Sequence, residues 1–465
     1  MSQKVVAILG GGLTGLSAAL YLSEYDYDIN IFEKENQLGG LVAGQIINNN
    51  IYEYGPHFFH TNNPEVLKVI KKIAGDKLID FKRTILIKFL GKYFIYPLSV
   101  KEVFKKLPKK IVIRAILSLI RHNLKRIFLR PQIINSENLL LGYYGDILYE
   151  MFFKDYIYHV WGIPPKDFSI KFAEERIPKI SASIFLNKLF SPIRTKFSKK
   201  TTKNFVENVD GNLYTTSEGY RGITTSLVNL LLNKGIKVHL NSEVKEIIID
   251  NNKITQILIE DKTNKNIKYY HFKCDGVINT TPINEITSKL NVTVPDNIYK
   301  ASKQLDFRSL VFVGILINKS SVLPVSFMYF REHSFNRIYD SSYFGHDTFT
   351  LDTTILVAEI SSSGNDEWWL SDEYCKKKVI DDLLKENLLS QNDILEVNVY
   401  RYKYGYPIYK LGYEENLQKL LDYLGNFKNF ETAGRQGLFQ YINGHIAIQM
   451  GFNAAADLIK NIYLS

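Results

Sequence analysis

Cysteine is almost absent from this chain, which has two of them, Cys274 and Cys375, among its 465 residues. Two cysteines cannot build a disulfide framework or supply four ligands to a structural zinc ion, so we expect a reducing compartment. The sequence also lacks a run of about 18 consecutive apolar residues, which a membrane-spanning helix needs. No secretory signal layout, internal repeat or extended low-complexity tract is found. These absences favour a globular protein in the cytoplasm.

An even distribution of charge is lacking as well. The formal net charge is +10, but residues 101–130 alone carry ten basic side chains and one acid, Glu102. Residues 191–203 add five basic side chains and no acid, so the remainder of the chain is mildly acidic. Two basic segments on an enzyme-like body are not the pattern of a nucleic-acid-binding protein, and we expect no nucleic-acid partner.

The larger basic segment has helical periodicity. Basic residues recur at 3.6-residue spacing on one face, and apolar residues occupy much of the other face, namely Ile113, Ile116, Leu117, Ile120, Leu124 and Ile127. Two interpretations remain open from the sequence. The helix either has a solvated basic face on a helical subdomain, or it lies at an anionic membrane or near an anionic substrate. Peripheral membrane contact through residues 101–130 and a homodimer are both left open.

A glycine-rich turn follows the first apolar segment. Residues 5–9 are typical of a buried parallel strand, and Gly10, Gly12 and Gly15 follow with the spacing G-x-G-x-x-G. The first glycine allows a tight turn, the second lets the backbone approach a pyrophosphate, and the third packs helix on strand. A second strand ends in Glu33, whose carboxylate suits the ribose hydroxyls of an adenosine. The segment therefore predicts a dinucleotide site.

The residues after Glu33 indicate which dinucleotide is bound. Gly39, Gly40, Leu41 and Gly44 form an extension that resembles the FAD-binding proteins of the glutathione-reductase and amine-oxidase type. Segments 235–244 and 277–282 have the pattern of strands that complete the FAD domain in those families. FAD is therefore favoured over NAD as the cofactor.

The expected fold class is α/β. Prolines interrupt a mostly helical stretch over 98–175, and short strands with turn residues dominate 205–365. We expect a Rossmann-like FAD-binding domain (1–90, 213–290 and 425–465) and an inserted helical subdomain (91–175). An antiparallel-sheet substrate domain (176–212 and 291–424) completes the chain, with a polar, basic linker at 191–212.

Short motifs along nearly the whole chain resemble those of the flavin-dependent UDP-galactopyranose mutases. Residues 54–63, YGPHFFHTNN, are similar to that family's Gly-Ala-His-x-Phe-His-Thr-Asn-Asn, with Pro56 at a small-residue position. Segment 153–162 is similar to its Phe-x-Lys-Gly-Tyr…Gln-Trp-Gly. Further similar motifs lie at residues 96–98, 176–178, 307–310, 335–338, 406–408 and 434–437.

This resemblance implies a redox-neutral reaction on a nucleotide sugar for cell-surface polysaccharide synthesis. The anomeric carbon is attacked by N5 of reduced FAD, the nucleoside diphosphate leaves, and the sugar ring opens and recloses as a furanose. The implied catalytic residues are His57, His60, Arg176 and Arg308. The implied substrate-binding residues are Tyr156, Trp161, Arg176, Arg308, Phe335, Arg337 and Tyr406.

The implied cofactor-binding residues come from six parts of the chain. They are Gly10, Gly12, Leu13, Thr14, Gly15, Glu33, Lys34, Gly40, Leu41, Tyr54, Gly55, His57, Val244, Thr280, Gly434, Arg435, Gly444, His445 and Ile446. No metal site is expected, because His57 and His60 lack a third ligand.

Other interpretations stay open from the sequence. Arg176 next to Glu174 and Glu175 is also compatible with a surface ion pair, and Trp161 and Tyr406 with core packing. Phe335 replaces a diphosphate-binding tyrosine, and Asn443-Gly444-His445 replaces a Met-Asp pair near the flavin. The alternative functions are an oxidase of the amine-oxidase or protoporphyrinogen-oxidase type and a membrane-surface FAD-binding protein.

Overall fold

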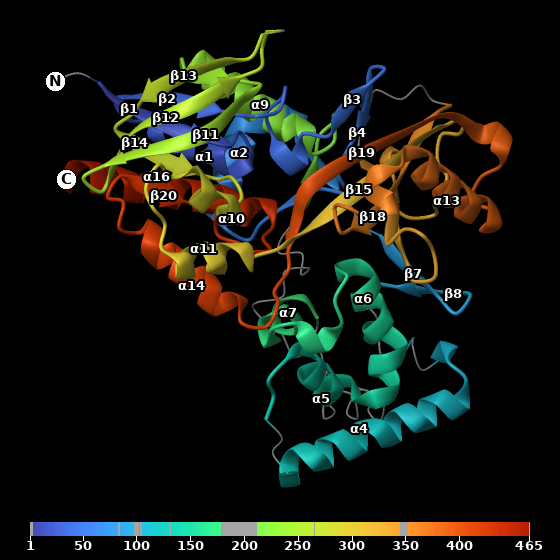
Figure 1. The fold of residues 1–465 in the computed structure, drawn as a ribbon. Helices are drawn as coiled ribbons and strands as arrows, with labels where there is room; N and C mark the ends of the chain where they lie inside the picture. Colours follow the sequence, from blue (N-terminus) through green and yellow to red (C-terminus); the bar gives the residue numbers. More distant parts are fainter. Residues whose placement is uncertain are drawn as a thin grey trace.

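The computed structural model describes residues 3–81, 84–96, 102, 105–129, 132–177, 212–264, 266–344 and 352–464. All but the last residue of the predicted linker at 191–212 lies outside these residues, and so do the second basic segment, Lys101 and Arg130. The chain forms a parallel-sheet part that contains both termini, a large second sheet, and a group of helices set apart from both (Figure 1). The predicted α/β class is confirmed.

Five parallel strands form the first sheet. They are β1 (Lys4–Leu9), β2 (Tyr27–Phe32), β10 (Lys237–His239), β14 (Gly276–Asn279) and β20 (Phe430–Thr432), in the order β10-β2-β1-β14-β20. Counted along the chain this is the order 3-2-1-4-5 of a doubly wound nucleotide-binding sheet. Helices α1 (Leu13–Leu22), α9 (Arg221–Asn233) and α16 (Gly444–Leu464) pack together on one face. Their apolar side chains form one core with β1 and β2.

An antiparallel sheet covers the other face of the parallel sheet. It consists of β11 (Ser242–Asp250), β12 (Lys253–Asp261) and β13 (Lys268–Lys273). Phe32 of β2 meets Phe272 of β13 edge to face at 5.0 Å between ring centroids. Smaller elements surround this part. They are β3 (Gln45–Ile47), β4 (Asn50–Tyr52), β5 (Phe59–His60), β6 (Ile79–Phe81), β9 (Leu213–Thr215), α2 (Pro64–Ala74), α10 (Ile283–Ile286), α11 (Asp296–Lys303), α14 (Tyr413–Leu424) and α15 (Gly434–Gly437).

A seven-stranded sheet forms the second part. Its order is β19 (Ile394–Pro407), β15 (Phe307–Ile317), β18 (Thr354–Ser362), β17 (Arg337–Asp340), β16 (Phe327–Phe330), β7 (Ile85–Phe89) and β8 (Lys92–Ile95). All neighbouring pairs are antiparallel except β16 and β7. The expected boundary between the FAD-binding domain and the helical subdomain, at residue 90, falls inside this sheet. It lies between β7, which pairs with β16, and β8. Helix α13 (Asp372–Lys385) packs on one face, and the short α12 (Glu367–Leu370) precedes it.

The remaining helices form a group at one end of the molecule (Figure 1). Helix α4 (Lys109–Leu129) packs against α5 (Ser136–Tyr149), and α6 (Asp155–Trp161) and α7 (Ile170–Arg176) follow. The last residues of α6 and α7, Trp161 and Arg176, reach the junction of the two sheets through contacts described below. This group therefore delivers two side chains to the place where both sheets meet.

Candidate active site

A cavity of about 530 Å³ lies between the two sheets. Its wall begins at the carboxyl ends of β1, β2 and β14, with Gly10, Glu33 and Thr280, and continues along β19 with Tyr402 and Tyr406. In a doubly wound sheet this edge is where ligands bind, because the helix N-termini and the strand ends meet there. The sequence motif and the cavity therefore coincide.

The glycine-rich turn forms one end of the cavity. Gly10 has φ +99°, and a Cβ on Gly15 would lie 2.1 Å from the carbonyl oxygen of Gly10, so only glycine lets α1 pack this closely on β1. A Cβ on Gly12 would meet nothing within 4 Å. Gly12 caps the N-terminus of α1 and lines the cavity, so its open side is room for an anion at a helix N-terminus.

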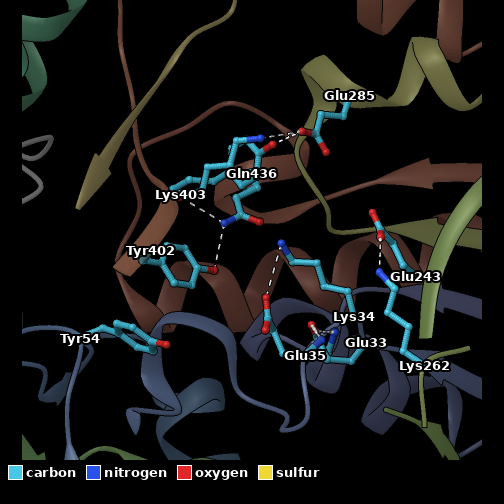
Figure 2. Close-up of polar contacts among 12 residues, drawn as sticks. Glu33, Lys34, Glu35, Tyr54, Glu243, Lys262, Glu285, Tyr402, Lys403 and Gln436 are labelled. Carbon is cyan, nitrogen blue, oxygen red and sulfur yellow. Dashed lines mark hydrogen bonds and ion pairs between the residues drawn. The ribbon is translucent and has the colours of Figure 1, made fainter. Parts of the chain in front are cut away.

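Glu33 is held rigidly beside this turn. Its carboxylate accepts hydrogen bonds from the main-chain N–H groups of Gly11 at 2.8 Å and Glu35 at 3.0 Å. Burial raises the pKa of Glu33. Figure 2 shows Glu33, Lys34 and Glu35 at one side of the site, with the Glu243–Lys262 ion pair near them and Tyr54 and Tyr402 further along.

The predicted motif at residues 54–63 lies deeper in the cavity. The N–H of His57 donates to the carbonyl oxygen of Gly55 at 2.8 Å, which closes a tight turn. Burial lowers the pKa of His57 to about 3, and the nearby Arg337 and Arg435 guanidinium groups contribute to this shift. The imidazole is therefore neutral at physiological pH. It is suited to hydrogen bonding and not to carrying a positive charge.

A buried carboxyl group anchors the same segment. The Tyr220 N–H donates to Glu53 Oε1 at 3.0 Å, and the hydroxyls of Tyr339 and Tyr400 donate to the Glu53 carbonyl oxygen at 2.6 and 2.7 Å. Burial raises the pKa of Glu53 to about 8. Three segments from different parts of the fold thus fix the backbone that leads to His57.

Arg337 and Arg435 lie at the opposite wall. Arg337 forms a two-pronged ion pair with Glu359, with Nε and Nη2 2.8 and 2.6 Å from Oε2, and Nη2 also donates to the Tyr406 hydroxyl at 3.2 Å. Arg435 donates to the carbonyl oxygen of Ile442 at 2.6 Å. Its guanidinium carbon lies 5.0 Å from the ring centroid of Tyr441. These contacts fix the positions of both guanidinium groups.

Arg176 and Trp161 reach the same tyrosines from the helical group. The guanidinium carbon of Arg176 lies 3.7 Å from the ring centroid of Tyr441 and 4.8 Å from that of Trp161. Trp161 packs edge to face on Phe172 at 5.2 Å and at a tilt on Tyr406 at 5.7 Å. Trp161 is therefore a packing anchor that also touches Tyr406 in the wall of the cavity.

Arg308 completes the group from strand β15. It is paired across the strands with Tyr406 of β19, and its Nε donates to the carbonyl oxygen of Val160 at 3.0 Å. A Cβ on Gly162 would lie 2.7 Å from Arg308 Nη1, so the α6 end approaches this guanidinium closely. Burial lowers the pKa of Arg308.

Most of the predicted site residues meet around the cavity. Those in its wall are Gly10, Gly12, Leu13, Thr14, Glu33, Lys34, Gly40, Leu41, Tyr54, His57, His60, Val244, Thr280, Arg337, Tyr406, Arg435 and Gly444. Gly15, Gly55, Gly434, His445 and Ile446 are next to wall residues in the chain or in space. A Cβ on Gly434, for example, would lie 2.6 Å from Thr14 Oγ1. The ring centroids of His60 and His445 are 4.9 Å apart.

Five predicted substrate residues do not line the cavity. Three of them, Trp161, Arg176 and Arg308, neighbour Tyr406 or Tyr441 of its wall, and the other two lie elsewhere. Phe335 is fully buried on the other face of the second sheet, packed with Phe330 and His333 in the core that α13 covers. It does not line the cavity, and we exclude it from the proposed site. Tyr156 on α6 is also absent from the wall. The guanidinium carbon of Arg331, the residue after β16, lies 5.6 Å from its ring centroid, so Tyr156 packs against the end of that strand.

Several wall residues were not predicted. Tyr402, Tyr441 and Gln436 line the cavity, and Gln436 donates to the Tyr402 hydroxyl at 3.1 Å (Figure 2). The alternation of tyrosines in β19 is a signal for the first of these, because residues two apart in a strand share one face. Tyr441 carries no comparable signal. Among the described residues, no group of three or more His, Cys, Asp or Glu side chains is arranged to hold a metal ion.

A family model described as flavin containing amine oxidoreductase matches residues 13–413. The chain belongs to this family. Its cofactor is FAD, and the open side of Gly12, the fixed Glu33 carboxylate and the cavity fit a dinucleotide of that kind. We infer that Gly12, Leu13 and Thr14 hold the pyrophosphate, that Glu33 holds the ribose, and that His57 lies near the flavin ring.

Comparisons within the amine oxidoreductases point to two kinds of enzyme. A probable UDP-galactopyranose mutase of Klebsiella pneumoniae is 26% identical over 36% of this chain, and a protoporphyrinogen oxidase of Dictyostelium discoideum is 22% identical over 100% of each chain. A solved structure of reduced UDP-galactopyranose mutase matches 98% of this chain and 96% of that chain, with a TM-score of 0.80 and 19% identity.

Sequence similarity to the mutases is confined to part of their length. The match covers 43% of the Klebsiella protein and 43% of a dTDP-fucopyranose mutase of Escherichia coli that is 24% identical over 35% of this chain. A solved structure of a putative protoporphyrinogen oxidase from Exiguobacterium has a TM-score of 0.68 at 19% identity and matches 98% of each chain. These comparisons establish a flavin enzyme of this family and its fold.

Proposed function

We propose that this flavoprotein is a mutase that interconverts the pyranose and furanose forms of a nucleotide sugar. The observation that carries the proposal is the meeting of Arg176, Arg308, Arg337 and Arg435 around Tyr406 and Tyr441. These arginines come from four distant segments. Within the described part of the chain, Arg337 is ion-paired with Glu359, whereas Arg308 and Arg435 form no ion pair with a carboxylate.

An excess of fixed cations at this wall suits a diphosphate. Arginine presents a planar fork of donors that matches phosphate oxygens, and hydrogen bonds between charged groups are about twice as strong as neutral ones. Arg176 lies over the Trp161 ring, and Arg308 contacts Val160 and Gly162, the two neighbours of Trp161 in the chain. The Tyr406 hydroxyl donates to Glu359 Oε1 and accepts from Arg337, so it fixes that ion pair beside the cavity. In the proposed complex the arginines bind the diphosphate in the ground state and stabilise it as it leaves the anomeric carbon.

The reactive end of the sugar lies toward His57 in this arrangement. FAD, when bound and reduced, supplies the nucleophile for the anomeric carbon. His57 is neutral and held by the turn with Gly55, so it orients a hydrogen-bonding group without adding charge. The arginines neutralise the leaving group, and the aromatic side chains around Tyr406 exclude water from it.

The second candidate is an oxidase of the protoporphyrinogen-oxidase type, which similarity along the whole chain favours. The arginines bear on this choice. A protonated amine would be repelled by the excess of arginines over carboxylates, whereas a porphyrinogen carries carboxylates that arginines also bind. The two candidates are separated by whether the substrate undergoes net oxidation.

Product analysis tests the proposal. Anaerobic, dithionite-reduced protein is incubated with UDP-galactose and, in parallel, with dTDP-fucose and other nucleotide sugars, and products are separated by chromatography and identified by NMR. A furanose product supports the mutase. Oxygen consumption with protoporphyrinogen or an amine, with no furanose from any nucleotide sugar, would support the oxidase instead.

A further inference from the structure

Helix α4 lies at the outer end of the molecule (Figure 1), and a stripe of its apolar side chains is exposed. The exposed fractions of its side chains are 58% for Ile113, 61% for Leu117, 41% for Ile120, 49% for Leu124 and 77% for Phe128. This spacing of three and four residues places them on one face. The opposite face packs on α5 and buries Ala115 and Leu119. Helix α4 therefore has two apolar faces. One packs on α5, and the other is exposed on the surface.

Cations border this stripe. Lys110, Arg114, Arg121 and Lys125 are exposed, and at 100° per residue they follow one edge of it, with Lys109 at the other. Helix α4 contains no acidic residue in its 21 positions. Arg121 is paired with Asp146 of α5 at 2.7 Å, whereas Lys109, Lys110, Arg114 and Lys125 are exposed cations for which the described residues show no ion pair.

We propose that α4 lies flat in the interface of an anionic lipid bilayer. Its apolar stripe, which ends in Phe128, enters the boundary between headgroups and acyl chains, and the bordering cations contact lipid phosphates. Among the described residues, no helix is long and apolar enough to span a membrane. This inference is independent of the reaction that the enzyme catalyses.

Charge makes a second copy of the chain a poorer occupant of this face. A symmetric dimer through α4 would place the same surface against itself. The cations along the stripe would then face one another without any acid on either copy of the helix. Phosphates of an anionic bilayer complement both the apolar and the charged part of the surface. The experiment below therefore distinguishes membrane binding from dimerisation through α4.

Vesicle sedimentation of the FAD-loaded protein tests the inference. One set of vesicles contains phosphatidylcholine alone. The other set contains phosphatidylcholine and phosphatidylglycerol in equal amounts. We expect binding to the anionic vesicles that weakens as salt is added. The triple variant Leu117→Ser, Leu124→Ser, Phe128→Ser should lower the partition coefficient by about tenfold or more. The double variant Arg114→Gln, Lys125→Gln should lower the partition coefficient by about fivefold for each charge removed.

Matched controls keep the result interpretable. Leu232→Ser removes a leucine that is 50% exposed on α9, and Lys377→Gln removes an exposed cation on α13. Both should bind vesicles like the unmodified protein, and all variants should keep the FAD spectrum and melting temperature. Absence of binding to anionic vesicles at low salt would overturn the inference. So would a concentration-dependent dimer in analytical ultracentrifugation that the triple variant converts to monomer.

Discussion

Arg176 stacks on Tyr441, with its guanidinium carbon 3.7 Å from the ring centroid. The contact joins the last turn of α7 to the segment before α16, so a helix outside both sheets is tied to the cavity wall. A stacked guanidinium keeps its N–H groups in the plane of the fork, where they can meet phosphate oxygens. This pair therefore orients one of the cations on which the proposed site depends.

Replacing Arg176 by lysine should weaken nucleotide-sugar binding although the charge is kept. Lysine cannot stack as a planar group or donate as a fork, so we expect the KM for the nucleotide sugar to rise about tenfold to hundredfold. Arg176→Met, which keeps packing on Tyr441, should be at least as defective. A normal KM in Arg176→Lys, measured with a full FAD complement, would reduce Arg176 to a packing residue.

Arg308→Ala should abolish measurable nucleotide-sugar binding while the protein stays yellow. Arg308 lies across the strand pair from Tyr406 and away from the glycine-rich turn, so its loss removes a phosphate contact and not a cofactor contact. We expect at least a tenfold loss of affinity in calorimetry. Lys377→Ala, which removes an exposed cation on α13, is the control. Equal affinity in both variants would remove Arg308 from the site.

Gly12→Ala should give a folded protein that fails to retain FAD. Gly12 has φ −74°, and a Cβ there meets nothing within 4 Å of the protein, so alanine fits the polypeptide itself. The added methyl group instead occupies the space for the pyrophosphate, and we expect FAD affinity to fall at least about tenfold.

Gly142→Ala is the matched control for this variant. Gly142 lies inside α5, where an added Cβ also meets no other atom, and alanine should raise the free energy of unfolding by up to about 1 kcal/mol. FAD content is measured from the visible spectrum of each purified variant. Full retention of FAD by Gly12→Ala would contradict the assignment of the glycine-rich turn.

The buried Glu53 carboxyl should make stability fall as pH rises. Because burial raises its pKa from 4.5 to about 8, the folded protein keeps a proton that the unfolded chain releases. The stabilisation is complete below the unfolded pKa and is lost as pH rises through the folded one, with a slope of up to about 1.4 kcal/mol per pH unit. Glu53→Gln, which keeps the acceptor for the Tyr220 N–H, should flatten this part of the curve.

Denaturant unfolding across this pH window checks the prediction. The two proteins should differ little at the acidic end, and the glutamine variant should be the more stable one at the alkaline end. Parallel stability curves for the two proteins would mean that Glu53 does not titrate above its ordinary range.

Local signals in the sequence were enough to predict the glycine-rich end of the cavity. The strand, the three glycines and Glu33 lie within one short segment, and each glycine has a backbone reason that can be stated without the fold. Short strands with turn residues were likewise expected within 205–365, and β12 is one of them. The family resemblance then led to Arg176, Arg308 and Arg337.

The opposite wall of the cavity could not be predicted in this way, because packing between distant elements forms it. No local pattern in Tyr441 indicates that Arg176 stacks on it, and none in Glu359 indicates its ion pair with Arg337. Phe335 was assigned to the site by its place in a motif. Its side chain instead joins the core under α13, because that helix offers an apolar surface on the far face of the sheet.

Counting turnovers per reduced FAD tests most directly whether the reaction is redox-neutral. The protein is reduced anaerobically with one equivalent of dithionite, excess reductant is removed, and UDP-galactose or another accepted nucleotide sugar is added. We predict on the order of a hundred or more furanose molecules per FAD, with the absorbance of reduced flavin unchanged. Product formation that stops at about one molecule per FAD, or that proceeds only as flavin is oxidised, would contradict the mutase proposal.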